Sequence, residues 1–332
     1  MSDLFRPDVF QGMRPLKKQR SRRAYFEGWY LKHVSGDKKH RFAFIPGVFI
    51  GPSQEDSHAF LQILDGMNAN YEYIRFPLSA FRPEKKIFRC KLQHNSFGLH
   101  GLSLDVSGKK FKIQGELNYL EPVRFPVTWK SPGIMGPFAY TPFMECYHGL
   151  VSLDHRIQGA LTVNGRNVDF SGGSGYIEKD WGRNFPSAYV WMQSNHFGAE
   201  GSLFASAARI PWITGSFRGF IMALYFDGKL HRFATYTGAR LIEVRVSSKQ
   251  VWMTVEDRQY RLEIESHRSA GALLMAPYEK AMIERVSETM TASIRFRLSE
   301  RKSGRTILED STDLGALEVQ GKLEQIAVVQ DS

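Results

Sequence analysis

The sequence predicts an all-β protein whose strands are joined mainly by tight turns. Its 332 residues include 29 glycines and 14 prolines, and many short apolar runs end at turn residues. Frequent chain reversals of this kind are typical of strands rather than of long helices. The hydrophobic content of 42% is that of a globular protein, and the length allows one large domain or two of medium size.

Several segments show the two-residue periodicity of a strand with one wet face. Apolar and polar side chains alternate in each, because successive side chains of a strand point to opposite faces. These segments are 111–117, 242–246, 260–265 and 294–298. Asn164-Gly165 and Asp227-Gly228 lie between apolar runs and predict hairpins, because both pairs tolerate the positive φ of a two-residue turn. The sheets are therefore expected to be antiparallel, unlike the open sheets that bind nucleotides.

Two segments interrupt this pattern. Residues 277–287 predict a helix, because Pro277 suits a first helical turn. Met282, Ile283 and Val286 would form its apolar stripe. Residues 122–142 hold five prolines and predict a long irregular loop, a kind of segment that often covers or forms a binding site.

Positive charge is concentrated near the N-terminal end. The net charge is +10, and residues 1–24 contribute seven cations and two anions, a net of +5. We interpret residues 1–24 as a basic arm, whose apolar side chains also suit contact with an anionic membrane surface. The alternative interpretation is a solvated tail that packs on the domain. Cations elsewhere are mixed with acids and no nucleic-acid motif occurs, so no nucleic-acid partner is expected.

Cysteine usage and hydropathy bear on the compartment. Cys90 and Cys146 are too few for a disulfide scaffold and lie in no CxxC motif. No apolar stretch has the length of a membrane span, which is about 18 residues, and no signal peptide is recognised. We expect a cytoplasmic protein that touches a membrane only peripherally, through the basic arm.

Familiar catalytic templates are missing from the sequence. It contains no HExxH, Walker, GxSxG or GxGxxG motif, which removes the usual support for zinc-protease, phosphate-binding, α/β-hydrolase and dinucleotide chemistry. The ten histidines are scattered, and a lone histidine is more often a satisfied polar residue than a metal ligand. We expect no metal site.

Two clusters of acids and aromatics remain. In YFEGWY, at 25–30, an extended backbone puts Tyr25, Glu27 and Trp29 on one face. In GYIEKDWG, at 175–182, it puts Tyr176, Glu178 and Asp180 together, and Trp181 follows. Carboxylates set among aromatic rings suggest a shaped site.

A third segment adds aromatic and amide groups. In YVWMQSNHF, at 189–197, Trp191, Gln193 and Asn195 share one parity and suit the wall of a pocket with a few polar anchors. The bland interpretation of all three segments is that the aromatics are core and that the acids form ion pairs. For Glu178 and Asp180 this would be a buried interdomain network, with Arg183 as a candidate partner.

At this point the sequence resembles a known family, the tocopherol cyclases and their bacterial relatives. The resemblance spans nearly all of the chain after the basic arm, and GYIEKDWGRNFPSAYVWMQSNHF at 175–197 is its most specific part. It also includes YFEGWY at 25–30, FDGKLHRF at 226–233 and ILEDSTDLGALEVQG at 307–321. The family's plant members carry a chloroplast transit peptide, which we do not expect in this protein, and their first half is longer than that of this sequence.

The resemblance implies a pair of lipocalin-like antiparallel β-barrel halves with few short helices, as in the carotenoid-hydratase-like superfamily. We accordingly expect an N-terminal domain at 25–170 and a C-terminal domain at 171–332. The family's plant members close a chromanol ring: a prenylated benzoquinol is protonated on a side-chain double bond, and the phenol oxygen captures the cation. The resemblance implies no cofactor and no metal.

We therefore expect an enzyme of the intramolecular lyase or isomerase type, acting on a hydrophobic prenylquinol-like substrate. Its acid would be Asp180 or Glu178, with Glu27 as the next candidate, because burial can keep a carboxyl group protonated near neutral pH. The expected substrate-binding residues are Tyr25, Trp29, Tyr176, Trp181, Trp191, Gln193 and Asn195. The alternative function is a non-catalytic binder or carrier of hydrophobic molecules, because barrels of this class enclose apolar ligands without chemistry.

Overall fold

The computed structural model describes residues 6–12, 24–142 and 144–328, and the chain divides into two compact units. The first unit contains Met1–Phe185 and Leu273–Arg285, and the second contains Pro186–Ala272 and Val286–Ser332. In the described residues the helical segments are short 3-10 turns, and the other regular elements are strands. The turns are η3 (Leu78–Ala80), η4 (Gly136–Tyr140) and η5 (Leu323–Gln325). The expected all-β class, with antiparallel strands in two sheets and few short helices, is confirmed.

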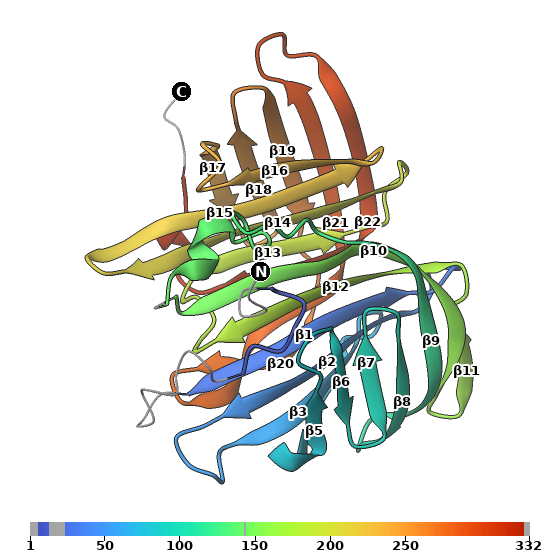
Figure 1. Cartoon of the computed structure of the whole chain (residues 1–332). Coiled ribbons are helices and arrows are strands. Elements are labelled where there is room, and N and C mark those ends of the chain that lie inside the picture. Colours follow the sequence, from blue (N-terminus) through green and yellow to red (C-terminus); the bar gives the residue numbers. More distant parts are fainter. Residues whose placement is uncertain (1–5, 13–23, 143, 329–332) are drawn as a thin grey trace. The chain divides into compact units, whose positions relative to one another are not determined.

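One sheet, with twelve described strands, lies in the first unit (Figure 1). Its order is β4-β3-β2-β1-β12-β10-β9-β8-β7-β6-β5, with β11 paired to β10. The strands are β1 (Tyr25–Val34), β2 (Arg41–Ile50), β3 (His58–Asp65), β4 (Asn70–Phe76), β5 (Phe81–Pro83), β6 (Arg89–Leu92), β7 (Asn95–Gly98), β8 (Gly101–Ser107), β9 (Lys112–Val123), β10 (Cys146–Val163), β11 (Arg166–Asp169) and β12 (Gly173–Gly182). Neighbours along this path pair antiparallel.

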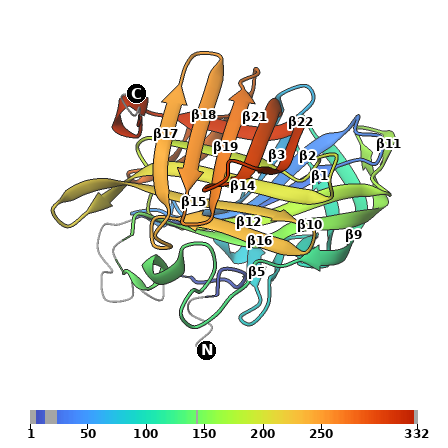
Figure 2. The ribbon, with the colours of Figure 1, turned by 90° about the horizontal axis from the view of Figure 1, so that it is seen from above.

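The other sheet, with ten described strands, has the order β16-β15-β14-β13-β22-β21-β19-β18-β17, with β20 paired to β21. Its strands are β13 (Tyr189–Ser194), β14 (Gly201–Trp212), β15 (Gly215–Phe226), β16 (Lys229–Ala234), β17 (Arg240–Val246), β18 (Gln250–Glu256), β19 (Tyr260–His267), β20 (Ala272–Tyr278), β21 (Ala281–Glu300) and β22 (Thr306–Gln320). Figure 2 shows β17, β18, β19 and β21 side by side. Its path is antiparallel too.

The predicted hairpin turns are confirmed. Asn164 and Gly165 have φ of 49° and 81° and connect β10 to β11, where Val163 pairs with Arg166. Asp227 and Gly228 have φ of 48° and 69° and connect β15 to β16. Positive φ at both central residues is the geometry of the type I′ turn. The segments with two-residue periodicity are also strands: they lie in β9, β17, β19 and β21, with Phe111 directly before the first residue of β9.

The predicted helix at 277–287 is wrong. Strand β20 ends at Tyr278 and β21 begins at Ala281, so the segment is a hairpin and the start of a long strand. Met282, Ile283 and Val286 fit a helical stripe, but a short apolar run fits a strand equally well. The proline-rich loop at 122–142 is largely irregular, with η4 as its helical turn.

The first of the two segments that form the first unit ends at Phe185, whereas the sequence analysis expects the domain boundary after residue 170. The difference arises from β12, which pairs with both β1 and β10 and therefore completes the first sheet. Residues 273–285 also group with the first unit, although they lie far along the chain. These assignments depend on long-range pairing, which no local sequence pattern encodes.

Each unit has its own apolar core. In the first unit the core lies on the sheet face that carries Trp29, Leu31 and Ile177, all at most 1% exposed. In the second unit it includes Met192 and Met253, both fully buried. Burial of these side chains supplies the main driving force for each unit, at roughly 25 cal/mol per Å² of apolar surface.

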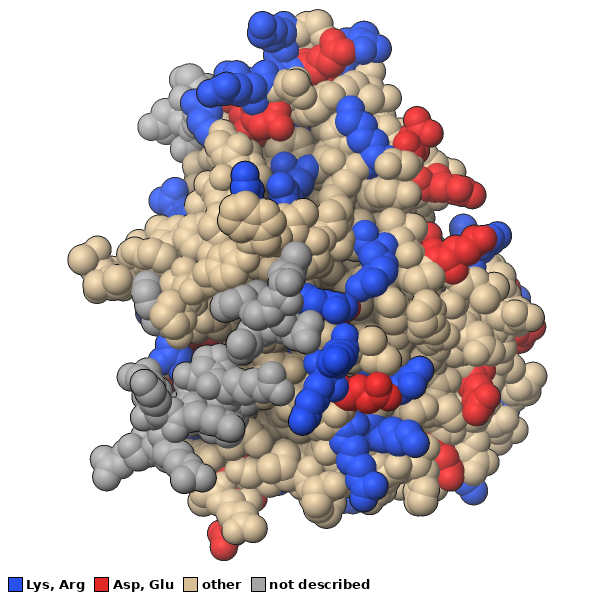
Figure 3. Space-filling model, viewed as in Figure 1, with Lys and Arg blue, Asp and Glu red and all other residues tan. Residues whose placement is uncertain are grey.

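Part of the basic arm packs on the first unit. Val9 is 1% exposed, and the ring of Phe10 lies 5.6 Å from that of Phe81. For residues 6–12 these contacts match the alternative interpretation of the arm as a tail that packs on the domain. Residues 1–5 and 13–23 of the arm lie outside the described residues, and the expected membrane contact stays a prediction. On the face drawn in Figure 3, Lys and Arg cover more surface than Asp and Glu. Within the described chain, no helix has the length and apolarity to cross a bilayer.

Candidate active site

The register of β1 against β12 sorts the predicted site residues onto two faces of the first sheet. Glu27 pairs with Trp181, and Trp29 pairs with Lys179. On the neighbouring positions Gly28 pairs with Asp180 and Tyr30 with Glu178. Because side chains alternate along a strand, Tyr25, Glu27, Trp29 and Trp181 share one face, and Tyr176, Glu178 and Asp180 share the other. The residues predicted from the sequence as one site therefore form two separate groups, one on each face of the sheet.

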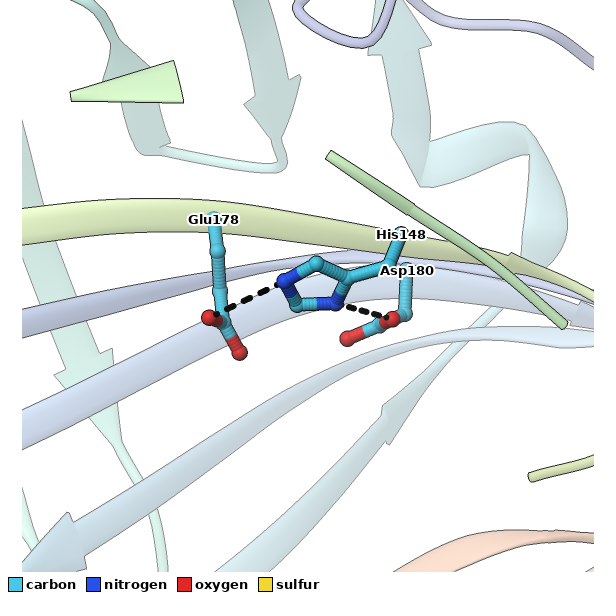
Figure 4. Close-up of side chains that lie close together, drawn as sticks. All are labelled: His148, Glu178 and Asp180. Atoms are coloured by element: carbon cyan, nitrogen blue, oxygen red, sulfur yellow. Dashed lines mark hydrogen bonds and ion pairs between the residues drawn. The ribbon is translucent and has the colours of Figure 1, made fainter. Parts of the chain in front are cut away.

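The first constellation is an acidic cluster around His148, which we define as His148, Glu178 and Asp180. His148 of β10 pairs directly with Asp180 of β12, and its Nδ1 lies 2.8 Å from the Asp180 Oδ1. Its Nε2 lies 3.5 Å from the Glu178 Oε2. Figure 4 shows the imidazole ring between the two carboxylates, each of which faces a different ring nitrogen. The ring therefore bridges the two acids.

Two opposing effects set the charge of this histidine. Burial alone would lower the pKa of His148, but attraction to Asp180 and Glu178, with the hydrogen bond to Asp180, outweighs it and raises the pKa to about 9. The imidazole is then protonated at neutral pH. The imidazolium therefore carries a proton that lies one hydrogen bond away from a carboxylate that could accept it.

The surroundings of the two carboxylates differ. The Tyr176 hydroxyl donates to Glu178 Oε2 at 2.6 Å, and burial with the nearby Glu178 charge raises the Tyr176 pKa well above its usual value. Tyr176 is thus a neutral hydrogen-bond donor. The Glu178 side chain is 5% exposed and that of Asp180 is 22% exposed. Asp180 is therefore the more accessible acid of the cluster.

The acidic cluster also has donors of the type that bind metals. One ligand atom from each of His148, Glu178 and Asp180 can be chosen so that all lie within 4.8 Å of one another. A histidine ligand must be neutral, however, and the raised pKa of His148 opposes that. Both ring nitrogens also face carboxylates rather than a common point. In this arrangement the imidazole is placed to hold a proton between the two acids.

The second constellation is a buried ion pair on the core-facing side. The Lys179 Nζ lies 2.6 Å from the Glu27 Oε1, and neither side chain is exposed. The ammonium also lies 5.1 Å from the ring centre of Trp29 and 4.5 Å from that of Trp181. Burial lowers the pKa of Lys179, and attraction to Glu27 opposes this. The aromatic residues of this face therefore surround a cation that is already paired.

Hydrogen bonds to Glu27 argue against it as the acid. The Tyr25 hydroxyl donates to it at 2.5 Å, and the backbone N–H groups of Gln11 and Gly12 donate at 2.7 and 2.9 Å. With Lys179, four donors face its two oxygens. These donors engage both oxygens of a carboxylate whose side chain is fully buried. Asp180 and Glu178 are accordingly the better acid candidates.

The remaining predicted residues lie in the second unit. Trp191 and Gln193 are on β13, and Asn195 follows its last residue, Ser194. They are buried, at 6%, 0% and 7% exposed. The other candidates all lie in the first unit.

Sequence reasoning missed His148 as a site residue. The histidine lies 32 positions before Asp180, and only the pairing of β10 with β12 brings them together. The segment that carries it, HGLVSLD, is an ordinary strand in composition. A hint was available in Glu178 and Asp180 sharing a strand face, because two adjacent carboxylates need a cationic partner.

Comparisons of the sequence with known proteins find tocopherol cyclases. Residues 127–321 match the family model described as tocopherol cyclase-like, a range that contains the whole acidic cluster but not Glu27. The chain is 26% identical over 207 residues to a probable chloroplastic tocopherol cyclase of Oryza sativa subsp. japonica, covering 59% of this chain and 44% of that protein. It is 27% identical over 204 residues to the chloroplastic tocopherol cyclase of Zea mays, covering 58% and 43%. The chain thus spans less than half the length of these curated relatives.

The fold is similar to solved structures as well. The crystal structure of CghA with Sch210972 has a TM-score of 0.54 at 10% sequence identity, covering 90% of this chain and 89% of that one. The crystal structure of CghA has a TM-score of 0.53 with the same coverage. At this identity the similarity concerns the fold alone.

Proposed function

This chain belongs to the tocopherol cyclase-like family, and from that premise we propose that it is a cyclase that needs no cofactor. The proposed reaction is acid-catalysed closure of a prenylated benzoquinol-type lipid to a chromanol. The observation that carries the proposal is the His148 imidazole held between Asp180 and Glu178, within the segment that matches the family. The proposed proton donor is Asp180.

Protonating an alkene requires an acid that keeps its proton at neutral pH. In the acidic cluster that proton resides on His148 before substrate binds, because of its raised pKa. An apolar substrate that covers Asp180 removes water from the pair, and desolvation favours two neutral groups over an ion pair. The proton then moves along the 2.8 Å hydrogen bond from His148 to Asp180.

The chemical steps balance without an oxidant or a reductant. Asp180 gives its proton to one carbon of the side-chain double bond, which leaves a tertiary cation on the other carbon. The phenol oxygen forms a bond to that cation, and the phenolic proton returns to the Asp180 carboxylate. One C–H and one C–O bond form, one O–H bond and one C=C π bond are lost, and the product is an isomer of the substrate.

The cationic intermediate needs stabilisation by the protein. The Glu178 carboxylate supplies a negative charge, and the Tyr176 ring beside it supplies a cation–π contact, worth roughly 0.5–2 kcal/mol. Trp191, Gln193 and Asn195 lie in the second unit, and their role in substrate binding stays a prediction from the sequence. Tyr25, Trp29 and Trp181 lie on the opposite face of β1 and β12, so we no longer propose them as contacts of this substrate.

The test is an anaerobic incubation of the protein with a prenylated hydroquinone, without added cofactor, followed by chromatography and mass spectrometry. The proposal expects a new compound of unchanged mass. Tight retention of the hydroquinone without conversion would instead support the carrier function. Oxidation to the quinone is recognised by its loss of two hydrogens, and a protein-free control measures it.

A further inference from the structure

The buried ion pair of Glu27 and Lys179 is completed by the chain's own residues 9–12. The backbone N–H groups of Gln11 and Gly12 donate to the Glu27 carboxylate, at 2.7 and 2.9 Å. The Lys179 Nζ donates to the Val9 carbonyl oxygen at 2.5 Å. This short segment therefore gives the pair two donors and one acceptor.

The same segment places an aromatic ring beside the pair. Phe10 lies 6.4 Å from the ring centre of Trp29 and 5.6 Å from that of Phe81. It borders a pocket of about 220 Å³, whose lining also includes Gly12, Tyr25, Val48, Ile50, Leu78, Phe81 and Pro83. Except for Tyr25, these side chains are apolar. The pocket is smaller than the roughly 300–1,000 Å³ of sites for drug-sized ligands.

A second observation points to a ligand at this position. The indole N–H of Trp29 is buried, with the residue 1% exposed, and has no hydrogen-bond partner among the described residues. Leaving a buried donor unsatisfied costs about 1–3 kcal/mol, so such groups are uncommon in a finished core. An acceptor on a bound molecule within hydrogen-bond distance of this N–H would satisfy it.

We propose that the position of Phe10, at the border of this pocket, is a binding site for a flat phenolic molecule of one or two rings, and that residues 9–12 occupy that site as an internal substitute for the ligand. The aromatic ring takes the position of Phe10. Its hydroxyl donates to Glu27 and accepts from Lys179, which replaces the backbone contacts of Gln11 and Val9. The site lies on the opposite face of β1 and β12 from the acidic cluster, and the inference does not depend on the proposed cyclase function.

A hydroxyl group is the specific chemistry that this site demands. A carboxylate ligand would meet the Glu27 charge, and a hydrocarbon would leave the pair without its replaced partners. A phenol supplies a donor and an acceptor from one atom. The site should therefore distinguish a phenol from its methyl ether, which has the same rings but no O–H.

The test uses 2-naphthol and 2-methoxynaphthalene as probes, titrated against the full-length protein and followed by quenching of tryptophan fluorescence. The expected result is binding of 2-naphthol about tenfold tighter than of the ether, since loss of one hydrogen bond to a charged group is worth about 1.4 kcal/mol or more. Equal affinity of the two probes, or no binding of 2-naphthol, would overturn the proposal without any variant being needed.

Variants locate the binding. Phe10→Ala removes the internal ring and should tighten 2-naphthol binding several-fold, whereas unchanged or weaker affinity with an unaltered melting temperature contradicts the substitute role. The double variant Glu27→Gln with Lys179→Met removes both buried charges together, so that neither is left unpaired. It should abolish the preference for the phenol over the ether, and a retained preference would place the probe elsewhere.

A variant of the other face separates this inference from the cyclase proposal. Asp180→Asn should leave the affinity for 2-naphthol unchanged, because its side chain lies across the sheet from the pocket. A tenfold loss in that variant would assign the phenol to the acidic cluster and refute the second site. If the protein cyclises the hydroquinone but does not bind 2-naphthol in this way, the second site is refuted and the cyclase proposal stands. If it binds 2-naphthol but does not cyclise the hydroquinone, the cyclase proposal fails and the second site stands.

Discussion

His148 and Asp180 face each other across strands β10 and β12, with 2.8 Å between the imidazole Nδ1 and the carboxylate Oδ1. Glu178 lies on the other side of the same imidazole, 3.5 Å from its Nε2. A single histidine thus connects the two acids that the sequence singled out. The proposed chemistry follows from this relationship, because the histidine holds at neutral pH the proton that a carboxylic acid must deliver.

Replacing the proposed donor should remove turnover and leave the fold intact. Asp180→Asn keeps the shape and a hydrogen-bond acceptor for His148 but cannot donate an acidic proton. We expect a loss of about 10²–10⁴-fold in kcat, the usual contribution of general acid catalysis. Steady-state kinetics and thermal melting measure the two properties.

The matched control for this substitution is Asp105→Asn, at an exposed position of β8 in the same unit. It should change neither kcat nor melting temperature by much. If Asp180→Asn unfolds the protein, or if it retains full activity, the acid role fails. Unfolding of both Asp180→Asn and Glu178→Gln would identify the cluster as a structural ion-pair network.

Turnover should depend on pH through His148. Because its folded-state pKa is raised to about 9, the cluster keeps its proton from neutral pH to about pH 8 and loses it above pH 9. The rate should accordingly fall about tenfold per pH unit on the alkaline side. A pH–rate profile measures this, and His148→Gln should move or remove the alkaline limb. A wild-type rate that still rises between pH 9 and 10 would contradict the claim that catalysis uses a proton held by His148.

Stability should fall on the acid side because of histidines in the core of the first unit. Burial lowers the pKa of His33 to about 3, and its Nε2 contacts the Tyr119 hydroxyl at 2.6 Å. The neutral form is therefore the folded form. Its contribution is complete above the unfolded pKa of about 6.5 and is lost as the pH falls towards 3, at about 1.4 kcal/mol per pH unit.

Urea unfolding at pH 7, 6 and 5 checks this expectation. We expect roughly 2 kcal/mol of loss from His33 between pH 6.5 and 5, with a further loss from His155, whose pKa burial also lowers. His33→Gln should reduce the slope. His100→Gln, at an exposed position, should not. If the free energy of unfolding fell equally steeply with decreasing pH in wild type and in His33→Gln, groups other than His33 would cause the loss of stability in acid.

Metal chelation should leave turnover unchanged. The three groups of the acidic cluster have ligand atoms within 4.8 Å of one another, but the raised pKa of His148 keeps the imidazole protonated. Dialysis against a chelator, followed by the cyclisation assay, tests this directly. Loss of activity that returns on adding Zn²⁺ or Mn²⁺ would replace the proton account with a metal centre.

Much of the fold was predictable, because alternating side chains and two-residue turns are local signals. The turn at Asn164-Gly165 depends only on the conformational freedom of its own residues. The helix predicted at 277–287 was wrong because the few apolar residues of this segment fit either a helix or a strand. The pairing of β20 with β21 decides between the two structures. Local propensity contains no information about this pairing.

The candidate site was only partly predictable, for a related reason. Alternation correctly grouped Glu178 with Asp180, and Glu27 with Trp29. It could not say that the two groups occupy opposite faces, because a shift of one residue in register would reverse that relationship. The same dependence on register concealed His148.

Cyclisation in D₂O is the most direct test of the central claim, that a proton from the acidic cluster adds to the alkene. His148 and Asp180 exchange their acidic protons with solvent, so the proton that they deliver becomes deuterium. The account predicts a chromanol with about one carbon-bound deuterium per molecule, retained after transfer to ordinary water. A chromanol without carbon-bound deuterium would contradict it.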